Sequence, residues 1–212
     1  MAAQEPSLRL YAILDAESCR RKHLDLFETA KALHGGGVRL LQYRDKSAER
    51  SEYLRNARQL RSLLPDCIFL LNDRADLVPE AEADGVHVGQ TDVSPDAARA
   101  HIGPDRILGI STHTGDQALA AHSTEADYLA IGPVFATVSK QNAEPTVGLC
   151  GVQAARAVTQ KPLVAIGGIG LGDARAVEMA GADSIAVISA LLPSSNLPEI
   201  TRRAQDFLAR LK

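Results

Sequence analysis

The stretch EADYLAIG (Glu125–Gly132) is repeated with few changes as EADGVHVG (Glu82–Gly89) and as GADSIAVI (Gly181–Ile188). Each copy follows a segment with helical spacing, makes a short turn at an Ala-Asp pair, and continues as an apolar run of strand length. Self-similarity of this kind indicates that one structural unit has been used several times. The repeat therefore predicts an architecture built from successive β/α units.

Other apolar, β-rich runs of strand length surround the three copies. We expect eight strands in all, at Leu8–Asp15, Val38–Asp45, Cys67–Asp73, Gly85–Gly89, Ile107–Thr112, Tyr128–Phe135, Pro162–Gly168 and Ser184–Ser189. Continuously apolar strands that alternate with helices are typical of a parallel sheet with both faces covered.

The segments between these runs carry helical patterns. An apolar stripe from Leu24 to Leu33 with a stop at Gly35 predicts one helix in the segment that begins at Ser18. A second helix is expected to open at Ser47 and to end before Pro65, and the last to cover about Leu197–Leu211.

Eight strands, each followed by a helix, favour a single-domain (β/α)8 TIM barrel over residues 8–212, with residues 1–7 as a loose N-terminal tail. The alternative is an open doubly wound sheet. The sequence disfavours it, because no G-x-G-x-x-G motif follows the first strand.

Composition restricts the functional classes. A net charge of −3 and only eight aromatic residues, four Phe and four Tyr, argue against nucleic acid or an anionic membrane as the partner. No apolar run approaches the roughly 20 residues of a membrane span. Three scattered cysteines give no disulfide framework, so a cytoplasmic protein is expected.

The expected carboxyl ends of the strands are strongly polar. In order along the chain they carry Gln42, Arg44 and Lys46; Asn72 and Asp73; His87, Gln90 and Asp92; Ser111 and His113; Thr137, Ser139 and Lys140; Gly167 and Gly168; and Ile188 with Ser189. A helix cap explains each of these polar groups alone, but not polar groups on so many adjacent strand ends. Since a barrel places its functional residues at this face, we expect a site there.

The residue types suggest two phosphate sites. Glycines after the seventh strand and the turn at Ser189 are typical of a backbone phosphate cradle. Asp73 and Asp92, with the cations Arg44, Lys46 and Lys140, fit a Mg²⁺-bound polyphosphate. The absence of paired His and Cys ligands disfavours a structural zinc site.

Several stretches, in this order, resemble the thiamine phosphate synthase family over nearly the whole barrel: QYRDK, LLNDRADL, GVHVGQTD, GISTH, ADYLAIGPVFATVSK, AIGGI and VIS. The resemblance implies a Mg²⁺-dependent transferase of thiamine biosynthesis. Such an enzyme joins 4-amino-2-methyl-5-(diphosphooxymethyl)pyrimidine to a thiazole (carboxy)ethyl phosphate and releases pyrophosphate. It also implies dissociative loss of pyrophosphate followed by attack of the thiazole nitrogen.

The resemblance further implies roles for individual residues. The pyrimidine diphosphate would be bound by Gln42, Tyr43, Arg44, Asp45, Lys46, Asn72, Ser111 and Lys140, of which Arg44, Lys46, Ser111 and Lys140 would be catalytic. The thiazole phosphate would be bound by Thr137, Val138, Ser139, Gly168, Ile188 and Ser189, and Mg²⁺ by Asp73 and Asp92. Ser139 departs from the family pattern, which often has Thr, but it keeps the hydroxyl.

Two other functions remain open at this point. A thiazole tautomerase would share the barrel and the single-phosphate site but would not need the Mg²⁺-diphosphate residues, which this sequence retains. A non-catalytic phosphate-binding barrel would have lost them. The loop from Ala136 to Gly148 is long enough to act as a lid, and His87 is expected to be a hydrogen-bonded barrel residue. The sequence does not assign a role to His113 and leaves the oligomeric state open, with a homodimer as one option.

Overall fold

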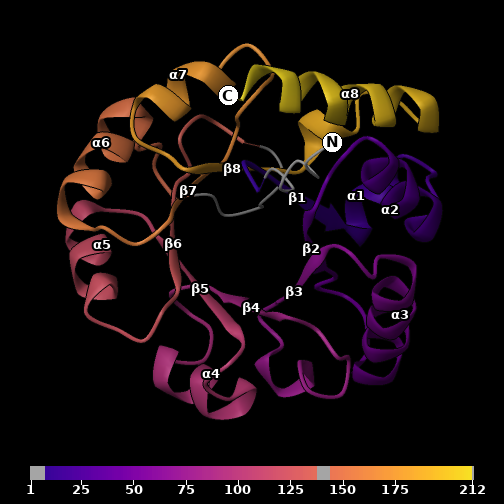
Figure 1. The fold of residues 1–212 in the computed structure, drawn as a ribbon, viewed down its shortest axis with the longest axis horizontal. Coiled ribbons are helices and arrows are strands. Elements are labelled where there is room, and N and C mark those ends of the chain that lie inside the picture. The colour runs from indigo at the N-terminus through magenta and orange to yellow at the C-terminus, as the bar shows by residue number, and fades with distance from the viewer. Residues whose placement is uncertain (1–7, 138–143, 212) are drawn as a thin grey trace, which may run out of the picture.

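Eight parallel strands, β1 to β8, close into a barrel in chain order (Figure 1). The structure is a computed structural model, and it describes residues 8–137 and 144–211. The strands are β1 Leu10–Asp15, β2 Leu40–Arg44, β3 Ile68–Asn72, β4 Gly85–Val88, β5 Ile107–Thr112, β6 Tyr128–Ile131, β7 Leu163–Ile166 and β8 Ser184–Val187. The expected barrel is confirmed. Residues 1–7, expected as a tail, lie outside the described residues.

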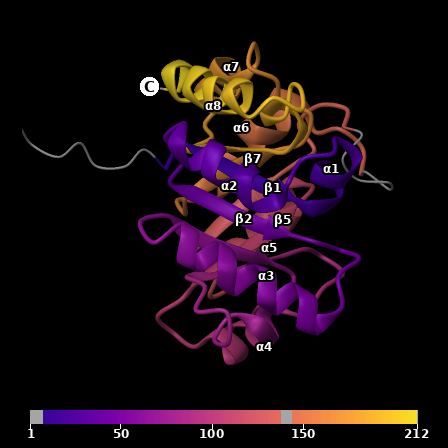
Figure 2. The ribbon, with the colours of Figure 1, turned by 90° about the vertical axis from the view of Figure 1, so that its right-hand side faces the viewer.

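Helices cover the outside of the barrel (Figures 1 and 2). They are α1 Ala16–Arg21, α2 Leu26–Gly35, α3 Arg50–Leu63, α4 Pro95–Ile102, α5 Gly115–His122, α6 Gly148–Val158, α7 Ala174–Met179 and α8 Leu197–Arg210, with short 3-10 helices η1 Ala75–Leu77 and η2 Ser189–Leu191. Among the described residues, no helix has both the length and the apolar character needed to cross a membrane.

The strands are apolar on both faces because each face packs against a different layer. Outward-facing residues such as Leu41, Leu71 and Leu129 join the large core between sheet and helices. Inward-facing residues form a second, smaller core, which contains Tyr11, Ile13, Leu70, Tyr128, Ala130, Val164 and Ala186. Parallel strands buried on both sides in this way produce the continuous apolar runs of the sequence.

One glycine shapes the barrel interior. An added Cβ at Gly109 would lie 2.0 Å from Cζ of Tyr128, so only a residue without a side chain leaves room for that ring. Gly109 on β5 pairs in register with Tyr128 on β6. The missing side chain on one strand thus allows the large ring of its neighbour to cross the barrel.

The helix boundaries correct two predictions. The single helix expected over the segment from Ser18 to Gly35 is two helices, because Asp25 caps a new start by accepting from the N–H groups of Phe27 and Glu28. The helix expected to open at Ser47 begins instead at Arg50, since the Ser47 hydroxyl is hydrogen bonded to Asp45.

A third correction concerns the segment after β3. An α-helix was expected after every strand, but the chain between β3 and β4 forms only the 3-10 helix η1 and turns. The segment is short, and Pro79 follows η1 closely. A proline lacks the N–H that would continue the helix.

The repeated Ala-Asp turns have one structural explanation. At each turn the aspartate accepts from an N–H in the first two residues of the preceding strand: Asp84 from Phe69 at 2.7 Å, Asp127 from Leu108 at 2.7 Å, and Asp183 from Leu163 at 2.8 Å. Each carboxylate therefore ties the start of one strand to the start of the next.

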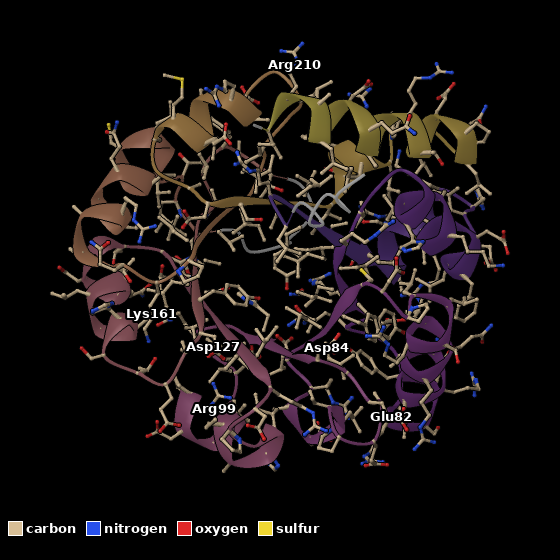
Figure 3. All side chains as sticks on the ribbon, in the orientation of Figure 1. Glu82, Asp84, Arg99, Asp127, Lys161 and Arg210 are labelled. Carbon is tan, nitrogen blue, oxygen red and sulfur yellow. The ribbon has the colours of Figure 1, made fainter. Side chains whose placement is uncertain are left out.

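An arginine completes each of these turns. Arg61 pairs with Asp84, Arg99 with Asp127 and Arg156 with Asp183, at 2.8 to 2.9 Å. Each guanidinium also donates to backbone carbonyls between its helix and the next strand, as Arg99 does to Gly103 and Arg106. We call these three pairs the Arg-Asp brackets; Asp84, Arg99 and Asp127 are labelled in Figure 3, which looks along the barrel from the end where the strands begin.

Candidate functional site

The carboxyl ends of β1 to β5 place a group of polar side chains at the mouth of the barrel. Alternation along each strand directs them to the inside, the same side as the inner core residues Leu40, Ile68 and Tyr11. The group consists of Asp15, Gln42, Arg44, Asn72, His87 and Ser111, all of them buried except the half-buried Asn72. The expected concentration of polar groups at this face is thus present.

Arg44 is held by a residue that the sequence analysis missed. Its Nη1 pairs with Oδ1 of Asp15 at the end of β1, and both side chains are nearly excluded from solvent. The second oxygen of Asp15 accepts from the N–H of Ser18 at 2.9 Å and from its hydroxyl at 2.6 Å. Asp15 occupies every second position of β1 together with Tyr11 and Ile13, so all three face the inside of the barrel. The alternation rule applied to the other strand ends would therefore have found it.

Asp73 and Asp92 lie together, as predicted. The N–H of Gly89 donates to Oδ2 of Asp92 at 2.8 Å, and Nζ of Lys46 pairs with Oδ2 of Asp73 at 2.6 Å. Burial and a hydrogen bond shared with Asp92 raise the pKa of Asp73 above its ordinary value, although Lys46 opposes the shift. The close approach of two carboxylates produces a concentrated negative charge at the mouth.

Asp73 also has an uncommon backbone conformation. Its φ of 63° lies in the left-handed region, which non-glycine residues seldom adopt. Asp73 follows β3 directly, and its N–H donates to the carbonyl of His87 on β4 at 2.9 Å. Departures of this kind often occur at functional sites, where the surrounding structure enforces them.

The donor set fits one kind of cation better than others. Over residues 8–137 and 144–211, no group of three or more His, Cys, Asp or Glu side chains is placed to hold a metal ion. A pair of carboxylates such as Asp73 and Asp92 is a donor set that Mg²⁺ can use, because this ion keeps several waters and completes its shell with substrate phosphates. Asp73 and Asp92 thus fit a cation that arrives with a diphosphate.

Two residues of the predicted diphosphate set face elsewhere. Tyr43 alternates with Gln42 and Arg44, so its fully buried ring points outward and packs on Tyr53 of α3, 4.6 Å between centroids. Asp45 pairs with Arg20 at 2.9 Å. Neither side chain joins the group at the mouth.

A chain of hydrogen bonds crosses the barrel just below the mouth. It links two predicted substrate ligands, Gln42 and Ser111, through Tyr11, Tyr128 and His87. His87 is the buried, hydrogen-bonded barrel residue that the sequence predicted. Neither tyrosine was predicted as part of the site, because the two apolar runs that contain them give no sign that their hydroxyls meet.

The side of the mouth expected to bind a single phosphate is formed by β7 and β8, which are paired neighbours. Gly167 and Gly168 have φ of 97° and 66° in the turn after β7, and Ser189 opens η2 after Ile188. An added Cβ at Gly168 would lie 2.4 Å from the carbonyl oxygen of Ala136. Gly168 is therefore needed for close backbone packing, whatever it binds.

The loop after β6 is described only in part. Thr137 is half-buried at its start, while Val138, Ser139 and Lys140 lie outside the described residues. The predicted roles of these three residues, and of the loop as a lid, stay predictions. His113, left without a role, hydrogen bonds through Nδ1 to the carbonyl of Gly132 at 2.5 Å.

Comparison with known proteins adds the chemical context. A family model described as thiamine monophosphate synthase matches residues 10–191. The thiamine-phosphate synthase of Koribacter versatilis is 50% identical over 203 residues, which cover 94% of each chain. That of Moorella thermoacetica is 38% identical over 210 residues, 98% of this chain and 99% of the other.

A solved structure agrees with the sequence matches. The thiamine phosphate pyrophosphorylase from Pyrococcus furiosus superposes with a TM-score of 0.82 at 32% identity, over 97% of this chain and 96% of that one. A 3-hexulose-6-phosphate synthase at 19% identity and a TM-score of 0.69 shares the fold alone.

Proposed function

Since the chain belongs to the thiamine monophosphate synthase family, we propose that it joins an aminopyrimidine methyl diphosphate to a thiazole phosphate, forming thiamine phosphate and pyrophosphate. The observation that carries the proposal is the arrangement of charge at the mouth. Paired carboxylates, Asp73 and Asp92, adjoin Lys46, and the buried Arg44 lies at the end of neighbouring β2. This set suits a metal-bound diphosphate that leaves during the reaction.

The first half of the reaction breaks the bond between the methylene carbon and the diphosphate oxygen. In the proposed mechanism the aminopyrimidine ring delocalises the positive charge that develops on that carbon. Arg44 and Lys46 stabilise the negative charge that builds on the departing pyrophosphate, and Lys140 in the loop after β6 is proposed to do the same. Fixed charges in a partly dry site act most strongly at this step.

Mg²⁺ belongs to the proposal as the cofactor. Asp73 and Asp92 would hold it, and when bound it would neutralise charge on the diphosphate. Lys46 already lies 2.6 Å from Asp73, so its ammonium group partly balances the carboxylate pair in the structure described here. Asp15 contributes by fixing the guanidinium of Arg44.

The second half of the reaction forms the new carbon–nitrogen bond. The thiazole nitrogen attacks with its own lone pair, so the protein need not supply a nucleophile or a strong base. We propose that Gly168, Ile188 and Ser189, with residues 137–139, bind the thiazole phosphate beside β7 and β8. The turn after β7 and the start of η2 suit a single phosphate bound through backbone groups.

Two further expectations are part of the proposal. A cytoplasmic location accords with three cysteines that are free thiols, of which Cys19 and Cys67 are buried. The thiazole tautomerase is the second candidate function, since it would use the single-phosphate side alone. The charged side formed by Asp73, Asp92, Lys46 and Arg44 favours the synthase, because a tautomerase has no diphosphate to bind.

A product assay tests the proposal. Purified protein is incubated with both phosphorylated substrates and Mg²⁺, and thiamine phosphate and pyrophosphate are measured together. Equal amounts of the two products are expected, with no product when the metal is removed by EDTA and recovery when Mg²⁺ is restored. Product formed at an undiminished rate in EDTA would contradict the metal role, and tautomerised thiazole as the sole product would favour the second candidate.

A further inference from the structure

The hydrogen-bonded chain across the barrel connects the two proposed pyrimidine ligands without a gap. Gln42 Nε2 donates to Tyr11 Oη at 2.6 Å, and the two phenol oxygens of Tyr11 and Tyr128 lie 3.0 Å apart. His87 continues the chain, with Nδ1 2.8 Å from Tyr128 Oη and Nε2 2.8 Å from Ser111 Oγ. All five side chains are buried, so these bonds have little competition from water.

The number of protons on these side chains restricts which atom donates in each hydrogen bond. Burial raises the pKa of Tyr11 and of Tyr128 far above the ordinary value for a phenol, so each keeps its single proton at neutral pH. A buried phenol carries one proton, and when it accepts from one neighbour it keeps that proton hydrogen bonded by donating to the other. With Gln42 donating to Tyr11, the arrangement that satisfies every proton has Tyr11 donating to Tyr128 and Tyr128 donating to Nδ1 of His87.

The same count of protons sets the donor and acceptor roles of Ser111 and Gln42, the two ends of the hydrogen-bonded chain. When Nδ1 of His87 accepts from Tyr128, the imidazole proton lies on Nε2, which donates to Ser111 Oγ. The hydroxyl proton of Ser111 and Oε1 of Gln42 are not used within this chain, so both can serve a ligand. The two ends of the chain thus offer one donor and one acceptor to a ligand, and their order is coupled through the intervening hydrogen bonds.

We propose that Tyr11, Tyr128 and His87 are positioning residues that set this donor–acceptor order and so select a 4-aminopyrimidine over a 4-oxopyrimidine. The 4-amino group donates and the ring nitrogen beside it accepts, which complements Gln42 Oε1 and the Ser111 hydroxyl. A 4-oxo ring has the opposite order, a carbonyl acceptor beside an N–H donor. The inference rests on the proposed function and adds to it the basis of substrate choice.

Binding of two unreactive ligands tests the proposal. The monophosphates of the 4-amino and the 4-oxo pyrimidinylmethanol lack the leaving diphosphate, and their dissociation constants are measured by calorimetry. The wild-type protein should prefer the amino compound by about 100-fold or more, because a buried site built for one hydrogen-bond order rejects the other strongly. In Tyr128→Phe the preference should fall to about tenfold or less, since both ends lose their fixed order.

A second variant separates the two ends. Tyr11→Phe removes the acceptor of Gln42 but leaves Tyr128 donating to His87, so its loss of preference should be smaller than that of Tyr128→Phe. A nitrogen-15 NMR spectrum of the imidazole gives a further readout that a merely structural role would not change. The proton of His87 should be on Nε2 in the wild type, and the Nδ1–H form should become populated in Tyr128→Phe.

Thr112→Val serves as the matched control. Thr112 is buried on the same strand as Ser111 but faces outward, where its hydroxyl donates to the carbonyl of Ala130 at 2.9 Å. The control should keep the wild-type preference. An unchanged preference in a folded Tyr128→Phe protein, or a wild-type proton on Nδ1, would overturn the inference.

The product assay distinguishes this failure from failure of the proposed function. A wild-type protein that makes thiamine phosphate, while Tyr128→Phe keeps the wild-type preference, would overturn the inference alone. A wild-type protein that forms no thiamine phosphate and binds neither monophosphate would overturn both.

Discussion

The two ends of the barrel use the same residue types in opposite ways. At the end where the strands begin, each aspartate of the Arg-Asp brackets accepts from a backbone N–H and pairs with an arginine. At the mouth, Asp73 lies beside another carboxylate, Asp92, and has a left-handed backbone conformation. The brackets satisfy their charges within the protein, whereas Asp73 and Asp92 are like charges held close together beside a single Lys46.

The difference teaches how to distinguish a structural aspartate from a functional one. Partners that are supplied entirely by the fold mark a structural role, as for Asp127. A carboxylate that the fold holds against its electrostatic preference implies a partner from outside the protein. Substitution of Asp127 should therefore affect mainly stability, whereas substitution of Asp73 should affect mainly turnover.

The largest effect is expected for Asp73→Asn. Turnover should fall by about 100-fold or more, because one of the two proposed cation ligands is lost. The melting temperature should stay the same or rise, since the substitution removes a half-buried charge that faces Asp92. Asn is chosen because it tolerates the left-handed conformation better than Ala. Steady-state kinetics and calorimetric melting check both parts; a lower melting temperature with full turnover would make Asp73 a structural residue.

A smaller effect on turnover is expected for Asp15→Asn. Arg44 would lose the partner that fixes its guanidinium, so kcat should fall by about tenfold. Removing one member of a buried ion pair should also lower the free energy of unfolding by about 3 kcal/mol. Ser18→Ala, which removes a hydroxyl that donates to Asp15 and accepts from Arg21, is the control. Equal kinetics in wild type and Asp15→Asn would show that Arg44 does not depend on this pair.

At the opposite end, Asp127→Ala should affect stability alone. The N–H of Leu108 and the guanidinium of Arg99 would lose an acceptor, at a cost of about 1–3 kcal/mol in the free energy of unfolding. Urea unfolding measures this cost, and kcat should not change. Asp116→Ala, at an exposed position in the first turn of α5, is the control and should cost less than about 0.5 kcal/mol. A fall in kcat matching that of Asp73→Asn would remove the distinction between the two ends.

The smallest effect concerns Asp45 and depends on pH. Burial would raise its pKa, but hydrogen bonds from Arg20 and Ser47 outweigh this and lower it. A lowered pKa in the folded state means that the ionised group stabilises the fold above the unfolded pKa of about 4, and that this stabilisation is lost as pH falls through the folded-state value. Wild type should therefore exceed Asp45→Asn by about 1 kcal/mol at pH 7, and the difference should shrink below about pH 4. A difference that grows on acidification would contradict this assignment.

The fold was largely predictable because its signals are local. A parallel strand buried on both faces must be apolar throughout, and the Ala-Asp turn occurs wherever a bracket forms. Helix boundaries were less predictable, because a cap such as Asp25 competes with a continuous apolar stripe. The short η1 was missed since nothing in the rule of alternating strands and helices excludes a turn in place of a helix.

The site was predictable where it depends on position along a strand and unpredictable where it depends on closure of the barrel. Gln42, Asn72 and Ser111 face the mouth because of alternation, and the same rule places Tyr43 outside. The pairing of Arg44 with Asp15 requires β1 and β2 to be neighbours in register. The contact of Tyr11 with Tyr128 joins strands far apart in the sequence, and no local pattern announces it.

The fit between Gly109 and Tyr128 has a consequence for how such barrels diverge. The ring of Tyr128 occupies the space that any side chain at position 109 would need. A lineage that acquires a larger residue at position 109 must therefore replace Tyr128 either beforehand or at the same time. That replacement also removes the phenol that is hydrogen bonded to both Tyr11 and His87. The two positions are expected to change together among homologues, and a chain that has changed both should have lost its ancestral choice of pyrimidine.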